Sequence, residues 1–370
     1  MNKRTLFSII LIMVFLSIIL TAQIIKIAAV LPNTGASSAF GQQGKQGLLL
    51  ANEMYPKVLG QNVMIVFIDT KSEKVESANA FTRAIDYERV VAIIGEISSS
   101  NTLAGSAIAE KKKVPTVTPT ATNPLVTQGK KYIFRVCFID PFQGLIAAKF
   151  AYEDLKAKKV AIFTDIEQDF CVGLASFFRK NFESLGGKVF EEYYRTGDQD
   201  FSAQLTDALS KNPDLLYVPG YYTEVALIAR QARQFGYNGP ILSADGCEAQ
   251  QLINIGGDAV ENLYYTTHYH PDAAQTDIAK IFVKKFEEKF GERPAALSAL
   301  IFDAYLMILK AIEAANSTDP EDIANALRNI KNFKGVTGII TMGEDGNPIK
   351  TGIINMVKNG KFVFVKAVNP

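Results

Sequence analysis

Two hydroxyl-rich segments of this 370-residue chain carry residue types suited to binding. Gly95-Glu-Ile-Ser-Ser-Ser-Asn101 follows an apolar run and precedes an alanine-rich helical pattern, and Thr118-Pro-Thr-Ala-Thr122 follows a second apolar run. The first segment is typical of a strand end with N-capping hydroxyls at a helix start. A helix start beside a second hydroxyl-rich loop can hold a small anion such as a carboxylate. Neither loop offers a nucleophile with an evident base, so the pattern favours binding over catalysis.

Three further residues lie where the pattern predicts that strands end. Asp245 and Tyr221 directly follow short apolar segments or their turns, and Phe170 comes shortly after another. In open parallel sheets, ligands bind outside the carboxyl ends of the strands. Aromatic rings and one carboxylate from a second sheet would therefore complement the hydroxyl groups from the first.

Short apolar segments alternate with longer amphipathic ones from Ile24 onward. This alternation predicts right-handed crossovers and parallel sheets. The number of strands is too large for one sheet of usual size, so we expect two sheets of about five strands each. The expected strands are 24–30, 63–68, 90–94, 114–117, 132–136, 160–164, 189–194, 215–218, 241–244 and 263–267. The expected helices are 41–55, 73–88, 99–111, 142–155, 170–185, 201–210, 222–235 and 246–255.

The C-terminal part of the chain has a different pattern. Residues 273–291 and 295–315 have long helical patterns, and a third helical pattern covers 320–329. Two strands follow at 352–357 and 361–365, joined by an Asn-Gly hairpin signal. If the long helices return to the first sheet, several chain crossings form a hinge between two lobes.

The N-terminus has the pattern of an export signal. Two basic residues precede an apolar run from Leu6 to Leu20, which small residues close. This arrangement predicts a secretory signal peptide over residues 1–22. The alternative, an uncleaved membrane anchor, usually needs about 20 apolar residues. No cysteine follows the run, so we expect a mature protein that begins near Gln23 and is free in the periplasm.

Charge and glycine patterns argue against nucleic acids and nucleotide cofactors as partners. The chain has 39 Lys and Arg residues against 38 Asp and Glu residues, and so lacks the basic excess of nucleic-acid-binding proteins. The glycine-rich segment 35–44 follows the first expected strand, but its glycines do not fit the dinucleotide fingerprint. We therefore expect no cofactor.

The potential metal ligands also form no recognisable site. The three cysteines, Cys137, Cys171 and Cys247, have no zinc-binding spacing, and we expect buried thiols with at most one disulfide. His268 and His270 stand at alternate positions, but no third ligand lies near them in the sequence. The acidic segment 165–169 begins like a calcium loop and lacks the required glycine. We therefore expect no metal.

Seven segments follow one another along nearly the whole chain after residue 24. They are Ile25-Lys-Ile-Ala-Ala-Val-Leu-Pro-Asn-Thr-Gly35, Phe40-Gly-Gln-Gln-Gly44, Gly95-Glu-Ile-Ser-Ser-Ser100, Thr118-Pro-Thr-Ala-Thr122, Phe170 with Gly173-Leu-Ala175, Pro219-Gly-Tyr221 and Ala244-Asp245-Gly246. In this order and spacing they resemble the periplasmic leucine/isoleucine/valine-binding proteins, and the resemblance extends from about Ile25 to the C-terminus. These proteins are the substrate-binding components of branched-chain amino acid ABC transporters.

The resemblance implies roles for residues that would bind the main-chain atoms of an amino acid. Ser99 matches the serine that holds the ligand carboxylate. Thr120 and Thr122 match positions that bind the amino acid backbone, Thr120 through its main-chain carbonyl. Tyr221 and Asp245 match the partners on the second lobe, with Asp245 facing the ammonium group. The family more often has Glu at this last position, so a shorter reach or a bridging water is implied here.

The resemblance also implies an apolar pocket for the ligand side chain. Phe40, Ile97 and Phe170 match the pocket positions, and both phenylalanines stand where tyrosine is common in the family. Ser98 replaces a cysteine of the family's disulfide, so that bridge is absent. Ser98 and Ala121 complete the predicted set of binding residues.

The implied fold is α/β, with two Rossmann-like lobes whose parallel central sheets are joined by a multi-strand hinge, as in type I periplasmic binding proteins. Lobe 1 would comprise residues 23–138 and 268–345, and lobe 2 residues 139–267 and 346–370. The implied function is capture of a free apolar amino acid, leucine, isoleucine, valine or phenylalanine, and its delivery to a membrane permease by a non-enzymatic monomer. A periplasmic receptor for amino acids or amides is the main alternative. An exported hydrolase or amidase is a third, for which no nucleophile–base pair is evident.

The chemistry of a zwitterion agrees with these roles. Its carboxylate needs donors and its ammonium needs an acceptor, and leaving either charge buried and unpaired costs roughly 3–5 kcal/mol. One methylene of the side chain is worth only about 1–3 kcal/mol. The sequence therefore predicts an α-amino acid but does not distinguish between apolar side chains.

Overall fold

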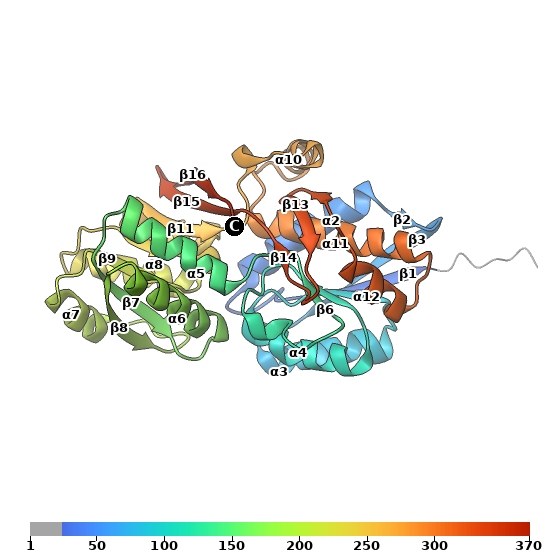
Figure 1. The fold of residues 1–370 in the computed structure, drawn as a ribbon, viewed down its shortest axis with the longest axis horizontal. Coiled ribbons are helices and arrows are strands. Elements are labelled where there is room, and N and C mark those ends of the chain that lie inside the picture. The colour runs from blue at the N-terminus through green and yellow to red at the C-terminus, as the bar shows by residue number, and fades with distance from the viewer. Residues whose placement is uncertain (1–23) are drawn as a thin grey trace, which may run out of the picture.

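The computed structural model describes residues 24–370 of the chain. The predicted signal peptide, residues 1–22, lies outside these described residues. None of the helices within residues 24–370 is long and apolar enough to cross a membrane. Figure 1 shows two α/β lobes side by side, with strands β13 and β14 and the C-terminus between them.

A six-stranded sheet forms the centre of the first lobe, in the order β2-β3-β1-β4-β5-β6. All its neighbouring strands pair in parallel except β2 with β3. Strand β1 (Ile25–Leu31) is buried almost throughout, as expected of a parallel strand covered on both faces. The other strands are β2 (Lys57–Val58), β3 (Gln61–Asp69), β4 (Ala92–Gly95), β5 (Thr116–Thr118) and β6 (Ile133–Arg135).

Helices cover both faces of this sheet. Ile27 and Ala29 of β1 belong to the apolar cluster that includes α2 and α11, whereas Ala28 and Val30 belong to the cluster that includes α3 and α4. This alternation follows from the two-residue period of a strand. The helices are α2 (Ser38–Met54), α3 (Lys74–Thr82) with the π-helical turn η1 (Arg83–Tyr87), α4 (Ser99–Lys112), η2 (Pro124–Val126), α10 (Asp277–Phe290), α11 (Ala296–Ala315) and α12 (Pro320–Arg328).

A seven-stranded sheet forms the centre of the second lobe, in the order β16-β15-β11-β10-β9-β7-β8. The five strands from β7 to β11 pair in parallel, and the C-terminal hairpin adds two antiparallel strands beside β11. The strands are β7 (Lys159–Asp165), β8 (Lys188–Tyr194), β9 (Leu215–Val218), β10 (Ile241–Ser243), β11 (Leu263–Thr267), β15 (Gly352–Lys358) and β16 (Lys361–Val368). The helices are α5 (Asp140–Lys149) with η3 (Phe150–Asp154), α6 (Asp169–Ser184), α7 (Ser202–Ser210), α8 (Tyr222–Gln234), η4 (Asp245–Cys247), α9 (Gln250–Gly256) and η5 (Gly257–Val260).

The chain crosses between the lobes three times: between β6 and α5, after β11, and before β15. After the second crossing it forms η6 (Pro271–Ala273) and the helices α10 to α12, and α11 packs against α2 of the first lobe. A small antiparallel sheet follows, of β12 (Phe333–Gly335), β13 (Gly338–Met342) and β14 (Pro348–Ile349). The buried Asp303 carboxylate of α11 anchors the turn of this sheet, because it accepts hydrogen bonds from the Val336 and Thr337 N–H groups (2.6 and 2.8 Å).

The expected fold class is confirmed, and each of the ten expected strands corresponds to one of β1 and β3 to β11. The pattern missed β2 and the small sheet β12–β14, whose strands are short and lack a continuous apolar run. Because β14 pairs with β13, a third crossing at 350–351 agrees better with the sheets than the predicted boundary after 345. With the third crossing placed at 350–351, the division of the chain into these two lobes remains our proposal.

Candidate functional site

A cavity with about 480 Å³ of empty space, partly open to solvent, lies between the two lobes. The carboxyl ends of strands from both sheets surround it, as is usual for ligand sites of parallel sheets. The residues that line it are Phe40, Gln43, Ile97, Ser98, Ser99, Thr120, Phe170, Tyr221, Asp245, Gly246, Glu248, Thr267, His268, Ala296 and Leu297. We refer to the side built by Ile97, Ser98, Ser99 and Thr120 as the first wall, and to the side built by Asp245, Glu248, Thr267 and His268 as the second wall.

A buried glutamate organises the loop behind the first wall. Glu96 Oε2 accepts hydrogen bonds from the N–H groups of Ile97 (2.7 Å) and Ser98 (2.8 Å). Burial raises the pKa of this carboxyl group, and the same hydrogen bonds oppose that shift. The preceding Gly95 has φ of +124°, and a Cβ there would lie 2.0 Å from the Val30 carbonyl oxygen, so the loop requires glycine. The Glu96 carboxylate is thereby used inside the first lobe and does not line the cavity.

The N-terminus of α4 begins at the first wall. Ser98 is its N-cap: the hydroxyl accepts from Asn101 N–H (3.4 Å) and donates to Glu96 Oε2 (3.2 Å). Among the residues that the structure describes, the N–H groups of Ser99 and Ser100 have no hydrogen-bond partner. Two free donors at the positive end of a helix dipole favour an anion.

The hydroxyl groups of the first wall are arranged to donate. Ser99 Oγ accepts a hydrogen bond from Asn123 N–H (3.2 Å), which leaves its proton available to an oxygen in the cavity. Thr120 Oγ1 donates to the Ile97 carbonyl (2.9 Å), which holds the second loop against the first. The first wall therefore presents N–H and O–H donors to the cavity.

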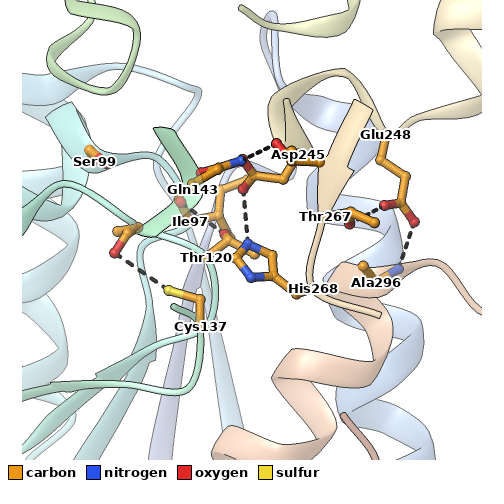
Figure 2. A network of polar contacts seen from close by, with 12 residues as sticks. Ile97, Ser99, Thr120, Cys137, Gln143, Asp245, Glu248, Thr267, His268 and Ala296 are labelled. Atoms are coloured by element: carbon orange, nitrogen blue, oxygen red, sulfur yellow. Dashed lines mark hydrogen bonds and ion pairs between the residues drawn. The ribbon is translucent and has the colours of Figure 1, made fainter. Parts of the chain in front are cut away.

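The second wall centres on Asp245, which begins η4 and is separated by one residue from the end of β10. Gln143 Nε2 donates to Asp245 Oδ1 (2.7 Å), and His268 Nε2 lies 3.1 Å from Asp245 Oδ2 (Figure 2). Burial lowers the pKa of His268, although its hydrogen bond to Asp245 opposes the shift. The lowered pKa favours the neutral imidazole, which donates to the carboxylate when its proton is on Nε2.

A second carboxyl group, Glu248, stands near Asp245 on the same wall. Thr267 Oγ1 donates to Glu248 Oε2 (2.5 Å), and the N–H of Ala296 donates to Oε1 (2.9 Å) (Figure 2). Burial raises the pKa of Glu248 to about 7, against the effect of these two hydrogen bonds. Because Ala296 is the first residue of α11, this carboxyl group also links the second lobe to a helix of the first.

Aromatic rings form the apolar part of the cavity. The ring of Tyr221 packs near those of Phe40 and Phe170, with centroid distances of 6.4 and 5.7 Å. Ile97 and Leu297 extend this apolar lining. The cavity thus combines donors, carboxylates and an apolar region, as a small-molecule site usually does.

Hydrogen bonds also join the two lobes near the cavity. Ser100 Oγ donates to Asp169 Oδ2 (2.8 Å) and accepts from Asp169 N–H (2.9 Å). On another side, Gln43 Nε2 donates to the Glu248 carbonyl (3.2 Å), and Tyr222 donates to the Ala36 carbonyl (2.5 Å). Residues from both lobes therefore meet around the same space.

The structure brings eight of the ten predicted binding residues to the cavity wall. Ala121 and Thr122 are the exceptions: both are fully buried and do not line the cavity. The loop turns inward after Thr120, because the buried Arg135 guanidinium donates to the Ala121 carbonyl (2.6 Å). The Thr122 hydroxyl lies instead beside the buried Asp140 carboxyl group, whose pKa burial raises to about 8. The binding roles of the other eight stay predictions.

Sequence reasoning missed several residues of the cavity wall. Glu248 lies only three residues after Asp245, and a second acid so close to a strand end was a usable signal. His268 follows the end of β11 but was considered only as a metal ligand. Ala296 and Leu297 come from a distant helix, and no local pattern pointed to them. The residues missed in this way are Gln43, Gly246, Glu248, Thr267, His268, Ala296 and Leu297.

The other side chains considered as metal ligands are buried or bonded within the fold. All three cysteines are buried and free. His270 Nε2 lies 3.4 Å from the Phe362 carbonyl, away from Asp245. Asp165 accepts hydrogen bonds from Glu167 N–H and from the Thr196 hydroxyl (2.9 and 2.6 Å). Within residues 24–370, no group of three or more His, Cys, Asp or Glu side chains could hold a metal ion.

Comparison with known proteins gives consistent matches over nearly the whole described chain. The family described as periplasmic binding protein matches residues 24–361. A leucine-, isoleucine-, valine-, threonine- and alanine-binding protein from Pseudomonas aeruginosa is 32% identical over 341 residues, which cover 90% of this chain and 89% of that protein.

Two solved structures are similar in fold and sequence. The leucine-binding protein LivK from Thermotoga maritima is 55% identical, with a TM-score of 0.93, and the match covers 94% of this chain and 99% of that one. The branched-chain amino acid transporter substrate-binding protein LivJ from Streptococcus pneumoniae, solved in complex with isoleucine, is 31% identical. Its TM-score is 0.89, and the match covers 94% of this chain and 100% of that one.

Proposed function

Since this chain belongs to the periplasmic binding protein family, we propose that it is the substrate-binding protein of an ABC transporter for branched-chain amino acids. Its relatives include proteins named for binding leucine, isoleucine and valine, and one solved with isoleucine bound. The proposed ligand is a free apolar α-amino acid: leucine, isoleucine or valine, with phenylalanine as a further candidate.

The observation that carries this proposal is the chemical polarity of the cavity. The Ser99 hydroxyl and the free N–H groups at the start of α4 supply donors on the first wall, and Asp245 supplies a carboxylate on the second. A zwitterion placed between them would pair its carboxylate with the first wall and its ammonium with Asp245. Charge-assisted hydrogen bonds of this kind are about twice as strong as neutral ones.

The apolar lining supports an aliphatic side chain. Phe40, Ile97, Phe170 and Leu297 would surround it without offering a charged partner. Burial of a leucine-sized side chain contributes about 1.5–3 kcal/mol. The contacts to the carboxylate and the ammonium would select α-amino acids as a class. The apolar lining would then determine which side chains bind more tightly.

We propose that the two lobes close over the ligand by a hinge motion, because residues of both lobes surround the cavity. A ligand that contacts both lobes binds the closed state better and so favours it. The closed form would deliver its ligand to a membrane permease. The relatives are solute-binding proteins, which supports a role without catalysis. We further propose that the mature protein acts as a monomer outside the cytoplasmic membrane.

Isothermal titration calorimetry of the protein from residue 23 with each of the twenty amino acids tests the proposal. Leucine, isoleucine or valine should bind, and at about 100 times the dissociation constant should stabilise the protein by roughly 2.7 kcal/mol. Leucinamide lacks the carboxylate and the keto acid of leucine lacks the ammonium, so each should bind about 100-fold more weakly or worse. Absence of binding by every amino acid would refute the proposal.

A further inference from the structure

We propose that His268, together with Gln143, is a positioning residue that holds the Asp245 carboxylate in the orientation that receives the ligand ammonium. This inference rests on the proposed function, because it assigns Asp245 to the ammonium group. It concerns two residues whose role would be exerted through Asp245 rather than through a hydrogen bond of their own to the ligand.

Each oxygen of the Asp245 carboxylate has one of these residues as its donor. Gln143 Nε2 donates to Oδ1 (2.7 Å), and His268 Nε2 lies 3.1 Å from Oδ2, to which a ring protonated at Nε2 donates (Figure 2). A carboxylate oxygen has two lone-pair sites, so one site on each oxygen remains for the ammonium. The two donors thereby fix the plane of the carboxylate without using up its capacity to accept.

The two donors are themselves held by the crossing segments of the chain. His268 follows β11 at the second crossing, is only 2% exposed, and packs its ring against Phe138 of the first crossing with a centroid distance of 3.8 Å. Gln143 Nε2 also donates to Thr266 Oγ1 (3.0 Å). The orientation of Asp245 therefore depends on two segments far from it in sequence.

The neutral state of the imidazole suits this role. A neutral donor orients the carboxylate and leaves its negative charge for the ammonium, whereas a lysine or arginine in its place would neutralise that charge. Burial lowers the pKa of His268 and so favours the neutral form. Its Nδ1 has no hydrogen-bond partner among the described residues, which fits a ring that carries its proton on Nε2.

Two other roles for His268 make different predictions. As a packing residue alone, it would be replaceable by phenylalanine, which keeps an aromatic ring against Phe138. As a direct ligand contact, which its place on the cavity wall permits, it would matter whether or not residue 245 carries a carboxylate. A positioning residue must donate to Asp245 and must lose its effect when that carboxylate is absent.

The test measures leucine affinity by calorimetry for His268→Phe, His268→Gln, Gln143→Leu and the control His270→Phe. His270 is a buried histidine two residues away that does not line this cavity. Loss of a hydrogen bond to a charged group predicts an affinity decrease of roughly 10- to 100-fold for His268→Phe and for Gln143→Leu. His268→Gln retains a donor and should bind within about threefold of wild type, as should His270→Phe.

A double-mutant cycle with Asp245→Asn separates the three roles. In that background His268→Phe should reduce leucine affinity by less than about twofold, because coupled residues are non-additive. Wild-type affinity in both His268→Phe and Gln143→Leu, or an equal loss from His268→Phe in both backgrounds, would overturn the inference. Thermal unfolding of the ligand-free variants checks that each is folded. If the wild-type protein binds no amino acid, the proposed function fails instead, and the two failures are therefore distinguishable.

Discussion

Carboxyl groups lie behind the first wall of the cavity and within the second, and only those of the second wall face the ligand space. On the first wall, Glu96 sits behind the loop and accepts its N–H groups, so that the α4 terminus presents donors to the cavity. On the second wall, Asp245 and Glu248 line the cavity themselves. The polarity of this site therefore comes from the direction in which acidic groups face rather than from their number.

The walls also differ in how they are assembled. The first wall comes from two loops at neighbouring strand ends, β4 and β5, and its hydrogen bonds join these two loops within one lobe. The second wall depends on Gln143, His268 and Ala296, which come from three separate segments. Changes at the first wall should therefore act locally, whereas changes at the second wall should involve the crossings and the contact between the lobes.

Removing the charge of Asp245 should have the largest effect on the difference between the two walls. Asp245→Asn should weaken leucine binding by roughly 3–5 kcal/mol, because the buried ammonium would lose the carboxylate with which it is proposed to pair. Calorimetry measures the loss, and Asp277→Asn serves as control because that side chain is 98% exposed. Unchanged affinity in Asp245→Asn would show that the ammonium does not face the second wall.

The pH dependence of stability should reveal the second carboxyl group of that wall. The pKa of Glu248 is about 7 in the folded protein against a usual 4.5, so the folded state keeps a proton that the unfolded state releases between these values. The free energy of unfolding should therefore fall as pH rises from 4.5 to 7, by about 3 kcal/mol from this group. Glu248→Gln should remove that part of the slope.

Chemical denaturation of the ligand-free protein at several pH values between 5 and 8 measures this slope. Asp140, whose pKa is raised to about 8, contributes with the same sign, so the informative quantity is the difference between wild type and Glu248→Gln. Equal slopes in the two proteins would contradict the role assigned to Glu248.

Deletion of the Ser99 hydroxyl group tests whether the first wall donates to the ligand carboxylate. Ser99→Ala should weaken leucine binding by about 1.5–3 kcal/mol, since a donor to the ligand carboxylate is lost. Ser106→Ala is the matched control, because Ser106 is buried in the same helix and donates only weakly to the Leu103 carbonyl (3.4 Å). Equal affinities of the two variants would remove Ser99 from the proposed site.

The neighbouring Ser98 should affect the stability of the protein more than its affinity for leucine. Ser98 caps α4, so Ser98→Ala should lower the free energy of unfolding by about 1 kcal/mol. Its effect on leucine affinity should be smaller than that of Ser99→Ala, because its hydroxyl is already bonded to Glu96. Urea denaturation and calorimetry on the same preparations measure both quantities. A larger loss of affinity in Ser98→Ala than in Ser99→Ala would reverse the two assignments.

Local pattern predicted the parts of the fold that have strong local signals. Buried parallel strands such as β1 are continuous apolar runs, and the Asn-Gly turn marked the C-terminal hairpin correctly. The small sheet β12–β14 escaped prediction because its strands are held mainly by pairing and by the distant Asp303 carboxylate. Thr122 was misplaced for a similar reason: the buried Arg135 redirects the loop after Thr120.

The sequence by itself determined the alternation of strands and helices, the capped start of α4 and the hydroxyl-rich and acidic loops at strand ends. These features depend on neighbouring residues, whose spacing sets periodicity, capping and turn geometry. Only the tertiary structure decided that His268 and Gln143 hold Asp245, and that Glu248 reaches the start of α11. Contacts of this kind depend on where three chain crossings place distant segments, and no local period in the sequence encodes that placement.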